Sequence, residues 1–329
     1  MKNKLPFWKG FNLLELFTEH SKGDFREDDF KWISEWGFNF VRIPMNYKTW
    51  ASENDLYNVK EEIIEKIDNV VYWGQKYNIH VNLNIHHAPG YCVNAKLNPS
   101  FNLWKTGEAL NAFIFYWQMF AKRYKDIDNK YISFNLINEP RDPSDEEMTR
   151  KDYENVIRKT VEKIRQISPD RLIMIDGLSY GNVPMPELID TGVAQSCRGY
   201  LPFGVSHFKA EWVHLKLDWK TPTWPFFDGN IEWNKDTLYN HYKKWAELIE
   251  NGIGVICGEG GAYCHTPHDV VLAWLNDLFD VLKEFNIGFA LWNFRGTFGI
   301  LDSQRQDVDY VDFYGHKLDK KMLDLFRSF

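Results

Sequence analysis

Short strand-like runs alternate with longer helical stretches along most of the sequence, and this alternation constrains the fold more than any other feature. The strand-like runs are rich in aliphatic and aromatic residues, as expected for strands that are buried on both faces. Strands are predicted at residues 8–13, 38–42, 79–86, 130–140, 171–175, 193–200, 204–208, 253–257 and 287–292. Helices are predicted at residues 28–36, 59–77, 107–124, 151–167, 186–191, 236–251, 269–285 and 319–326. Such an alternation predicts a mainly parallel sheet.

We interpret the pattern as eight strand–helix units, although it is less regular between residues 177 and 208. No linker rich in glycine and serine divides the 329 residues, so we predict an α/β protein with a single domain over residues 1–329. Eight units in a chain of this length fit one closed (β/α)8 TIM barrel. A doubly wound sheet is the alternative, but no glycine-rich phosphate-binding fingerprint follows the first predicted strand.

A barrel of this kind carries its functional groups where the strands end, at the C-terminal face. Polar or aromatic residues occur at six predicted strand ends: Arg42, His86 and His87, Asn138 and Glu139, His207, Glu259, and Trp292. Any one of them could serve packing alone, as a salt-bridge partner, a buried histidine or a plug of the barrel. Six such positions at one end of a barrel favour a functional site.

Two of these residues are carboxylic acids with unusual neighbours. Glu139 precedes Pro140, which cannot donate a hydrogen bond to a neighbouring strand and therefore ends the strand beside the carboxyl group. Glu259 lies between two glycines, which leave space for a ligand. Since the fourth and seventh strands lie across the mouth of such a barrel, the two carboxyl groups could face each other. Opposed carboxyl groups are the minimal equipment for glycoside hydrolysis.

Several segments resemble glycoside hydrolase family 5, a group of retaining (β/α)8 glycosidases with an Asn-Glu pair on strand four and a Glu on strand seven. The resemblance covers nearly the whole chain and is carried by residues 41–44, 85–91, 134–140, 206–208, 258–260 and 291–293. It implies that Glu139 is the acid/base, that Glu259 is the nucleophile, and that Asn138 donates to the sugar 2-hydroxyl. The other implied substrate-binding residues are Arg42, which supports the nucleophile, His86 and His207, which line the subsite at the cleavage point, His87, and the stacking platform Trp292. A retaining mechanism also implies carboxyl groups about 5 Å apart.

One position departs from the family pattern. The family usually has a tyrosine two residues after the strand-six histidine, placed to hydrogen-bond the nucleophile, whereas Lys209 stands two residues after His207. Either Lys209 points away and Tyr200 or Tyr263 takes the role, or the ammonium group lies close to Glu259.

Composition narrows the class of partner. The net charge of −7, without a cluster of Lys and Arg, argues against nucleic acid as a binding partner.

No apolar run is long enough to span a membrane, and the N-terminus lacks the continuous apolar stretch of a secretion signal, so we expect a cytoplasmic protein. The four cysteines have no paired CxxC spacing, so we expect thiols rather than disulfides or a zinc site. No metal or cofactor is expected, and the oligomeric state stays open.

Other functions are less well supported. Histidines 86, 87, 265 and 268 could indicate a metal-dependent sugar isomerase or amidohydrolase, but the His-X-His spacing after the first strand is absent. A non-catalytic sugar-binding protein has no need of opposed acids. Aromatic loops at 47–57, 91–104 and 212–233 could frame a groove for several sugars. They favour an endo-acting β-1,4-glucanase, with a β-mannanase or an exo-acting β-glycosidase on imported oligosaccharides as alternatives.

Overall fold

The computed structural model describes residues 2–94, 101–213 and 220–329. Its parallel strands form a closed barrel in the order β1-β10-β9-β6-β5-β4-β3-β2. The predicted (β/α)8 fold is therefore confirmed. The chain contains two compact units, one of residues 1–13 and 198–329 and one of residues 14–197. The single domain over residues 1–329 stays a prediction.

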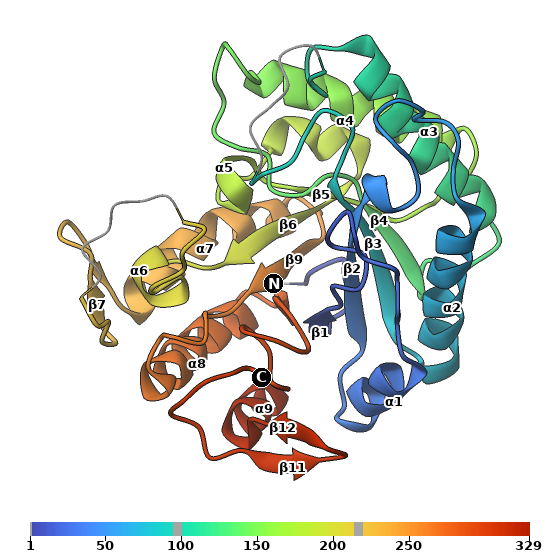
Figure 1. The fold of residues 1–329 in the computed structure, drawn as a ribbon. Coiled ribbons are helices and arrows are strands. Elements are labelled where there is room, and N and C mark those ends of the chain that lie inside the picture. The colour runs from blue at the N-terminus through green and yellow to red at the C-terminus, as the bar shows by residue number, and fades with distance from the viewer. Residues whose placement is uncertain (1, 95–100, 214–219) are drawn as a thin grey trace. The chain divides into compact units, whose positions relative to one another are not determined.

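The unit of residues 14–197 consists of consecutive parallel strands with helices between them. Its strands are β2 (Phe40–Asn46), β3 (His80–His87), β4 (Ile132–Asn135) and β5 (Ile173–Asp176), followed by β6 (Ala194–Gly199), which continues into the other unit. Its helices are α1 (Glu27–Glu35), α2 (Glu61–Tyr77), α3 (Gly107–Arg123) and α4 (Arg150–Arg165), with the short turns η1 (Tyr47–Thr49), α5 (Leu178–Gly181) and η2 (Pro186–Thr191). The strands pair in sequence order, so that Val81 lies opposite both Val41 and Ile132. In Figure 1, β2, β3 and β4 lie side by side, and α2 and α3 lie beyond them.

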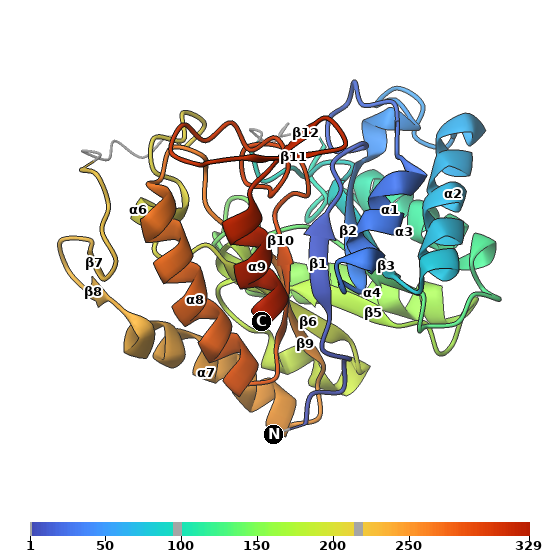
Figure 2. The same cartoon turned by 90° about the horizontal axis from the view of Figure 1, so that it is seen from below.

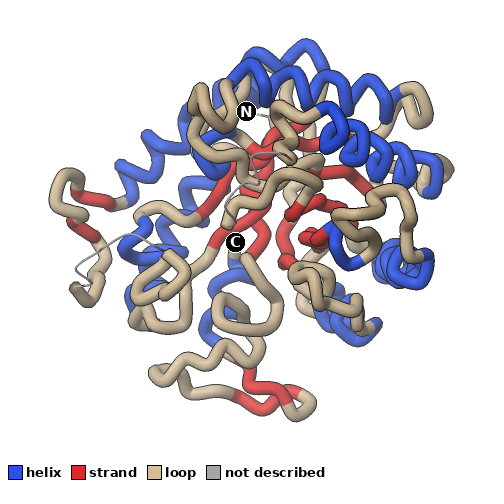
Figure 3. The backbone as a smooth tube through the Cα atoms, turned by 45° about the horizontal axis from the view of Figure 1, so that its top comes forward, coloured by secondary structure: helices blue, strands red, loops and turns tan. Residues whose placement is uncertain are grey.

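The unit of residues 1–13 and 198–329 supplies the other strands. These are β1 (Lys9–Asn12), β9 (Val255–Gly260) and β10 (Gly288–Leu291), and β10 pairs with both others. The helices are α6 (Phe203–Ser206), α7 (Lys235–Glu250), α8 (His268–Glu284) and α9 (Lys320–Ser328), and Figure 2 shows α7 beside α8. Two hairpins, β7 (Phe226–Phe227) with β8 (Glu232–Trp233) and β11 (Val311–Phe313) with β12 (His316–Leu318), are separate pairs of red segments in Figure 3.

Side-chain caps set where several helices begin. Helix α4 starts with a capping box, in which Thr149 accepts from the backbone N–H of Asp152 and the Asp152 carboxylate accepts from that of Thr149. Asn234 and Asp319 cap α7 and α9 in the simpler way, each accepting one backbone N–H of the first turn. These polar residues satisfy N–H groups that have no partner inside their own helix.

Aromatic side chains fill much of the core. Trp50, Trp117, Trp245 and Trp274 are among the largest fully buried side chains. Trp212 is different, since 46% of its surface is exposed. The aromatic composition therefore reflects packing to a large extent. Within the described ranges, none of the helices combines the length and the apolar character that a membrane crossing requires.

Three sequence-based placements need correction. Residues 204–208 were predicted as a strand, but Phe203–Ser206 is the short helix α6, with Pro202 at its N-terminus. A five-residue apolar run has no period long enough to separate strand from helix. Arg42 does not close its strand, because β2 continues to Asn46. The strand before the Asn-Glu pair ends at Asn135, so Asn138 and Glu139 lie in the segment after β4.

The three aromatic loops are only partly visible. Residues 47–57 are described in full, but 95–100 and 214–219 lie outside the described residues. The groove that the loops were expected to frame stays a prediction.

Candidate active site

The backbone of Glu139 is held by two side chains rather than by a strand. Its N–H donates to Oδ2 of Asp176 at 2.9 Å, and its carbonyl accepts from the Tyr91 hydroxyl at 2.6 Å. Burial raises the pKa of Tyr91 well above its ordinary value, so this hydroxyl keeps its proton. Glu139 has a φ of 43°, a left-handed conformation that is uncommon outside glycine. The acid predicted from the sequence therefore sits in a fixed, unusual backbone.

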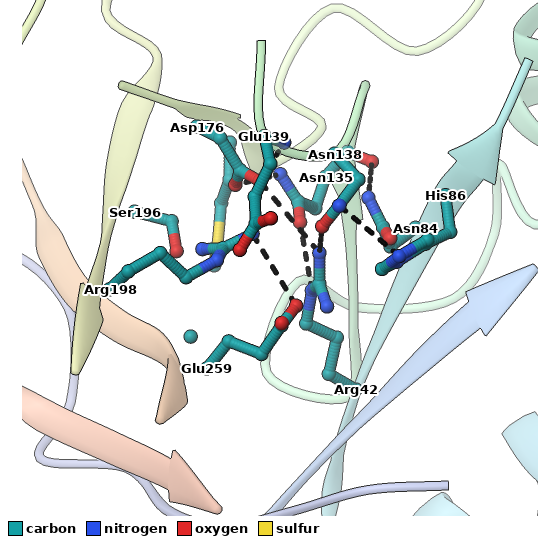
Figure 4. A network of polar contacts seen from close by, with 12 residues as sticks. Arg42, Asn84, His86, Asn135, Asn138, Glu139, Asp176, Ser196, Arg198 and Glu259 are labelled. Carbon is teal, nitrogen blue, oxygen red and sulfur yellow. Dashed lines mark hydrogen bonds and ion pairs between the residues drawn. The ribbon is translucent and has the colours of Figure 1, made fainter. Parts of the chain in front are cut away.

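Arg42 connects the polar groups near the end of β4. Its Nε donates to Oδ1 of Asn135 at 2.9 Å, and its Nη2 donates to Oδ1 of Asn138 at 2.8 Å. The same Nη2 lies 3.8 Å from Oδ2 of Asp176. Figure 4 shows these residues in one network. Because Arg42 is buried in the middle of β2, it can reach groups at the ends of two other strands, β4 and β5.

Asp176 was missed by the sequence analysis. It is the last residue of β5, it is fully buried, and its Oδ1 accepts from the Asn135 amide at 3.0 Å. The predicted strand stopped one residue earlier, and Asp-Gly at 176–177 is also a common turn signal. The available signal in the sequence was a carboxylate directly after an apolar run, at residues 171–176.

His86 and His87 close β3 as predicted, but they have different partners. Nε2 of His86 lies 3.2 Å from the Asn138 amide, so this histidine belongs to the network around the Asn-Glu pair. Nδ1 of His87 lies 2.7 Å from the amide of Asn46, and burial lowers the pKa of His87 to about 4. The ring of Phe17 packs against both histidines. Their contact with a substrate stays a prediction.

Glu259 is the fifth residue of β9 and is only 4% exposed. The Tyr200 hydroxyl donates to its Oε1 at 3.0 Å, and Nη2 of Arg198 lies 3.5 Å from its Oε2. Each carboxylate oxygen therefore has a donor group beside it. Arg198 is itself buried near the end of β6, where its backbone carbonyl accepts from the hydroxyl of Tyr242.

These contacts resolve the departure at Lys209. Tyr200, one of the two tyrosines proposed as substitutes, hydrogen-bonds Glu259, whereas Lys209 is exposed and its ammonium lies over the ring of Phe208. Tyr200 stands two residues after Arg198 at the end of β6, which is the spacing that was sought at 207 and 209. The strand-six pair is therefore Arg198 and Tyr200. Arg198 escaped notice because the expected residue type there is histidine.

His207 follows helix α6 and does not end a strand, so its predicted position was wrong. Its ring stacks on Phe203 at 4.3 Å and lies 5.0 Å from the ring of Tyr200. Burial lowers the pKa of His207 to about 4, so the ring is neutral near pH 7. The histidine thus packs beside the tyrosine that touches Glu259, and its role in binding substrate stays a prediction.

Trp292 directly follows β10 and is half-buried. Its backbone N–H donates to the carbonyl of Gly260 at 2.7 Å. Asn12, another residue that the sequence analysis missed, donates to the carbonyls of Gly258 and Leu291 at 3.1 Å each. These bonds tie the segments that carry Glu259 and Trp292 to β1. The stacking role of Trp292 stays a prediction.

The chemistry available is that of two carboxylic acids in different surroundings. Glu139 has a fixed backbone, and Glu259 has a fixed carboxylate. In the part of the chain that the structure describes, no group of three or more His, Cys, Asp or Glu is arranged to hold a metal ion.

Comparisons with known proteins agree with the barrel fold. Endoglucanase C of Acetivibrio thermocellus is 27% identical over 316 residues, which cover 88% of this chain and 90% of the relative. Cellodextrinase A of Ruminococcus flavefaciens is 28% identical over 278 residues, covering 80% of this chain and 76% of the relative. A crystal structure described as a glycoside hydrolase is 38% identical, covers 98% of both chains and superimposes with a TM-score of 0.91. The model of the cellulase family, glycosyl hydrolase family 5, matches residues 3–297, and the chain therefore belongs to this family of glycoside hydrolases.

Proposed function

We propose that this glycoside hydrolase cleaves β-1,4-linked glucan by double displacement, with Glu259 as nucleophile and Glu139 as acid/base. The observation that carries the proposal is the pair of contacts on Glu259. A tyrosine hydroxyl and a guanidinium group beside its two oxygens fix the orientation of the carboxylate. An oriented carboxylate can attack the anomeric carbon and form a covalent glycosyl-enzyme.

The surroundings of Glu139 suit the other role. An acid must keep its distance to the leaving oxygen while the glycosidic bond breaks, and a backbone held at both its N–H and its carbonyl supports this. After the leaving group departs, the same carboxylate removes a proton from water, which then releases the sugar from Glu259. Asn138, held by Arg42, is available to donate to the sugar 2-hydroxyl.

The substrate class rests on the relatives and on exposed aromatic residues. The relatives are named endoglucanase and cellodextrinase, names that denote enzymes acting on glucans and on cellodextrins. Trp212 is nearly half exposed, and its ring lies 4.8 Å from that of Tyr263. Flat side chains of this kind stack on sugar rings. We infer an endo-acting enzyme on soluble glucan.

The substrate is tested by comparing hydrolysis of carboxymethyl-cellulose, glucomannan, and cello- and manno-oligosaccharides. We expect turnover of the glucan substrates, with internal cleavage producing a rapid fall in viscosity. The Glu259→Ala variant, which should be inactive on all of them, is the control for contaminating activity. Faster cleavage of manno-oligosaccharides would indicate a mannanase, and release of single end units without loss of viscosity would indicate exo action.

The roles of the two acids are tested with two leaving groups. Glu139→Ala should lose activity on cello-oligosaccharides but still release an acidic phenol from an aryl cellobioside, because that leaving group needs no proton. Glu259→Ala should lose activity on both substrates. Equal losses in the two variants on both substrates would refute the assignment.

A further inference from the structure

Asp176 connects the end of β5 to the residues around the Asn-Glu pair through both of its carboxylate oxygens. One oxygen accepts from the backbone N–H of Glu139 at 2.9 Å, and the other accepts from the side chain of Asn135 at 3.0 Å. Asn135 in turn accepts from Arg42, which donates to Asn138. A single carboxylate thus orients Glu139 directly and Asn138 through two intermediate side chains, as Figure 4 shows.

The backbone of Glu139 needs such support. Its φ of 43° is uncommon for a residue with a side chain, and a residue before proline normally prefers an extended conformation. Conformations of this kind persist only where the surroundings hold them in place. Here the N–H of Glu139 is held by Asp176 and its carbonyl by Tyr91, which itself is buried.

Asp176 is in turn fixed by the barrel. It pairs with Ser196 on β6, and its own carbonyl accepts from the hydroxyl of Tyr153 at 2.6 Å. The carboxylate therefore transfers the rigid geometry of β5 to a segment that has left β4. A side chain with only this function would have no contact with the substrate.

We propose that Asp176 is a positioning residue for the acid/base, and that with Tyr91 it forms a clamp on the backbone of Glu139. The inference rests on the proposed role of Glu139 as the acid. It assigns to the clamp the specific task of keeping the carboxyl group at a constant distance from the leaving oxygen. Loss of the clamp should therefore slow cleavage of a glycoside that needs a proton more than cleavage of one that needs none.

Asp176→Asn is the most selective variant. The amide has nearly the same shape, but only one of its two end atoms can accept a hydrogen bond. Its NH2 group must then face either the N–H of Glu139 or the NH2 of Asn135, so one contact is lost. Tyr91→Phe removes the second half of the clamp and keeps the ring. Asp319→Asn is the matched control, since Asp319 is also fully buried but caps α9.

The measurement is the ratio of kcat/KM for an aryl cellobioside with an acidic phenol to kcat/KM for cellotetraose. We expect Asp176→Asn and Tyr91→Phe to raise this ratio about tenfold or more, because general acid catalysis is worth about 100-fold or more for the poorer leaving group. Asp319→Asn should leave the ratio unchanged even if it lowers the unfolding temperature.

An unchanged ratio in a folded Asp176→Asn protein would overturn the proposal. Should this variant not fold, an unchanged ratio in Tyr91→Phe would do the same. Glu139→Ala separates this failure from a failure of the proposed function. If Glu139→Ala raises the ratio and the clamp variants do not, only the clamp is refuted, whereas a wild-type ratio in Glu139→Ala refutes the assignment of the acid.

Discussion

The hydroxyl group of Tyr200 can be removed while the rest of the side chain stays in place, so its effect on Glu259 can be measured by itself. Tyr200→Phe removes the donor to Oε1 of Glu259 and keeps the ring that packs on His207 and Phe298. A hydrogen bond to a charged group contributes about 1.5–3 kcal/mol, so we expect kcat to fall about 10-fold to 100-fold. Steady-state kinetics on an aryl cellobioside measures the loss, and thermal unfolding checks that the fold is retained.

Lys209→Met is the matched control for that variant. Its ammonium group is exposed and lies over Phe208, so its removal should leave turnover and the pH profile as they are. Full activity in Tyr200→Phe, or a comparable loss in Lys209→Met, would contradict the assignment of Tyr200 as the residue that orients Glu259.

For single residues, the sequence identifies as functional those whose immediate neighbours in the chain are unusual. Glu139 is followed by a proline, which restricts the backbone, and Glu259 lies between two glycines, which leave space for a ligand. Both features can be recognised without a structure. Asp176 and Arg198 are each followed by a glycine as well, but Asp-Gly is equally a turn signal, and a glycine after Arg198 does not separate it from an arginine in a core ion pair. Their importance depends on contacts with residues far away in the chain, Glu139 and Glu259, which only the folded barrel brings about.

Close packing of glycines holds the strand that carries Glu259. A Cβ on Gly260 would lie 2.7 Å from the carbonyl oxygen of Gly199 and 2.5 Å from the ring of Phe289. Since the first neighbour is backbone, Gly260→Ala should displace β9 and with it the preceding Glu259. We expect a loss of about 1–3 kcal/mol in the free energy of unfolding. Urea denaturation measures it, and kcat should fall as well.

Gly107→Ala provides the contrast. A Cβ at Gly107 has open space, and the residue begins helix α3, so the substitution should be neutral or stabilise the protein by about 0.4–1 kcal/mol. Equal stabilities of the two variants would show that the contact between Gly260 and Gly199 does not constrain β9.

Long buried runs and long periodic helices are predictable elements, and here the predicted barrel strands and the long helices occur within a few residues of their expected limits. Short elements are not predictable in this way. The hairpins β7–β8 and β11–β12 have strands of two or three residues, too few to show an alternation. The prediction of a strand at residues 204–208 was wrong for the same reason, because so short an apolar run fits the helix α6 equally well.

Buried histidines make the stability of the whole molecule depend on pH. Burial lowers the pKa of His80 and His241 to about 3 and that of His87 and His207 to about 4, from an ordinary value of 6.5. Between the lowered and the ordinary values, the unfolded chain binds protons that the folded protein does not. Stability therefore falls as the pH decreases below about 6.5, by up to about 1.4 kcal/mol per pH unit for each histidine.

The pH dependence is measured by urea denaturation from about pH 7 to about pH 5. We expect a lower midpoint at the lower pH. His80→Gln removes one of the groups at the start of β3, away from the carboxyl ends of the strands, and should lose less stability on acidification than the unaltered protein. A stability that is constant or increases toward pH 5 would contradict the burial of these rings.

The central claim is that Glu259 forms the covalent bond to the sugar while Glu139 transfers the proton. An activated 2-deoxy-2-fluoro-cellobioside tests it most directly, because the fluorine slows release of the sugar and lets the glycosyl-enzyme accumulate. After proteolysis, mass spectrometry locates the attached sugar. We expect the label on Glu259, with Glu139→Ala also able to form the adduct because the leaving group needs no proton. A label on Glu139 or on any other residue would contradict the account, as would a product of inverted configuration formed without an adduct.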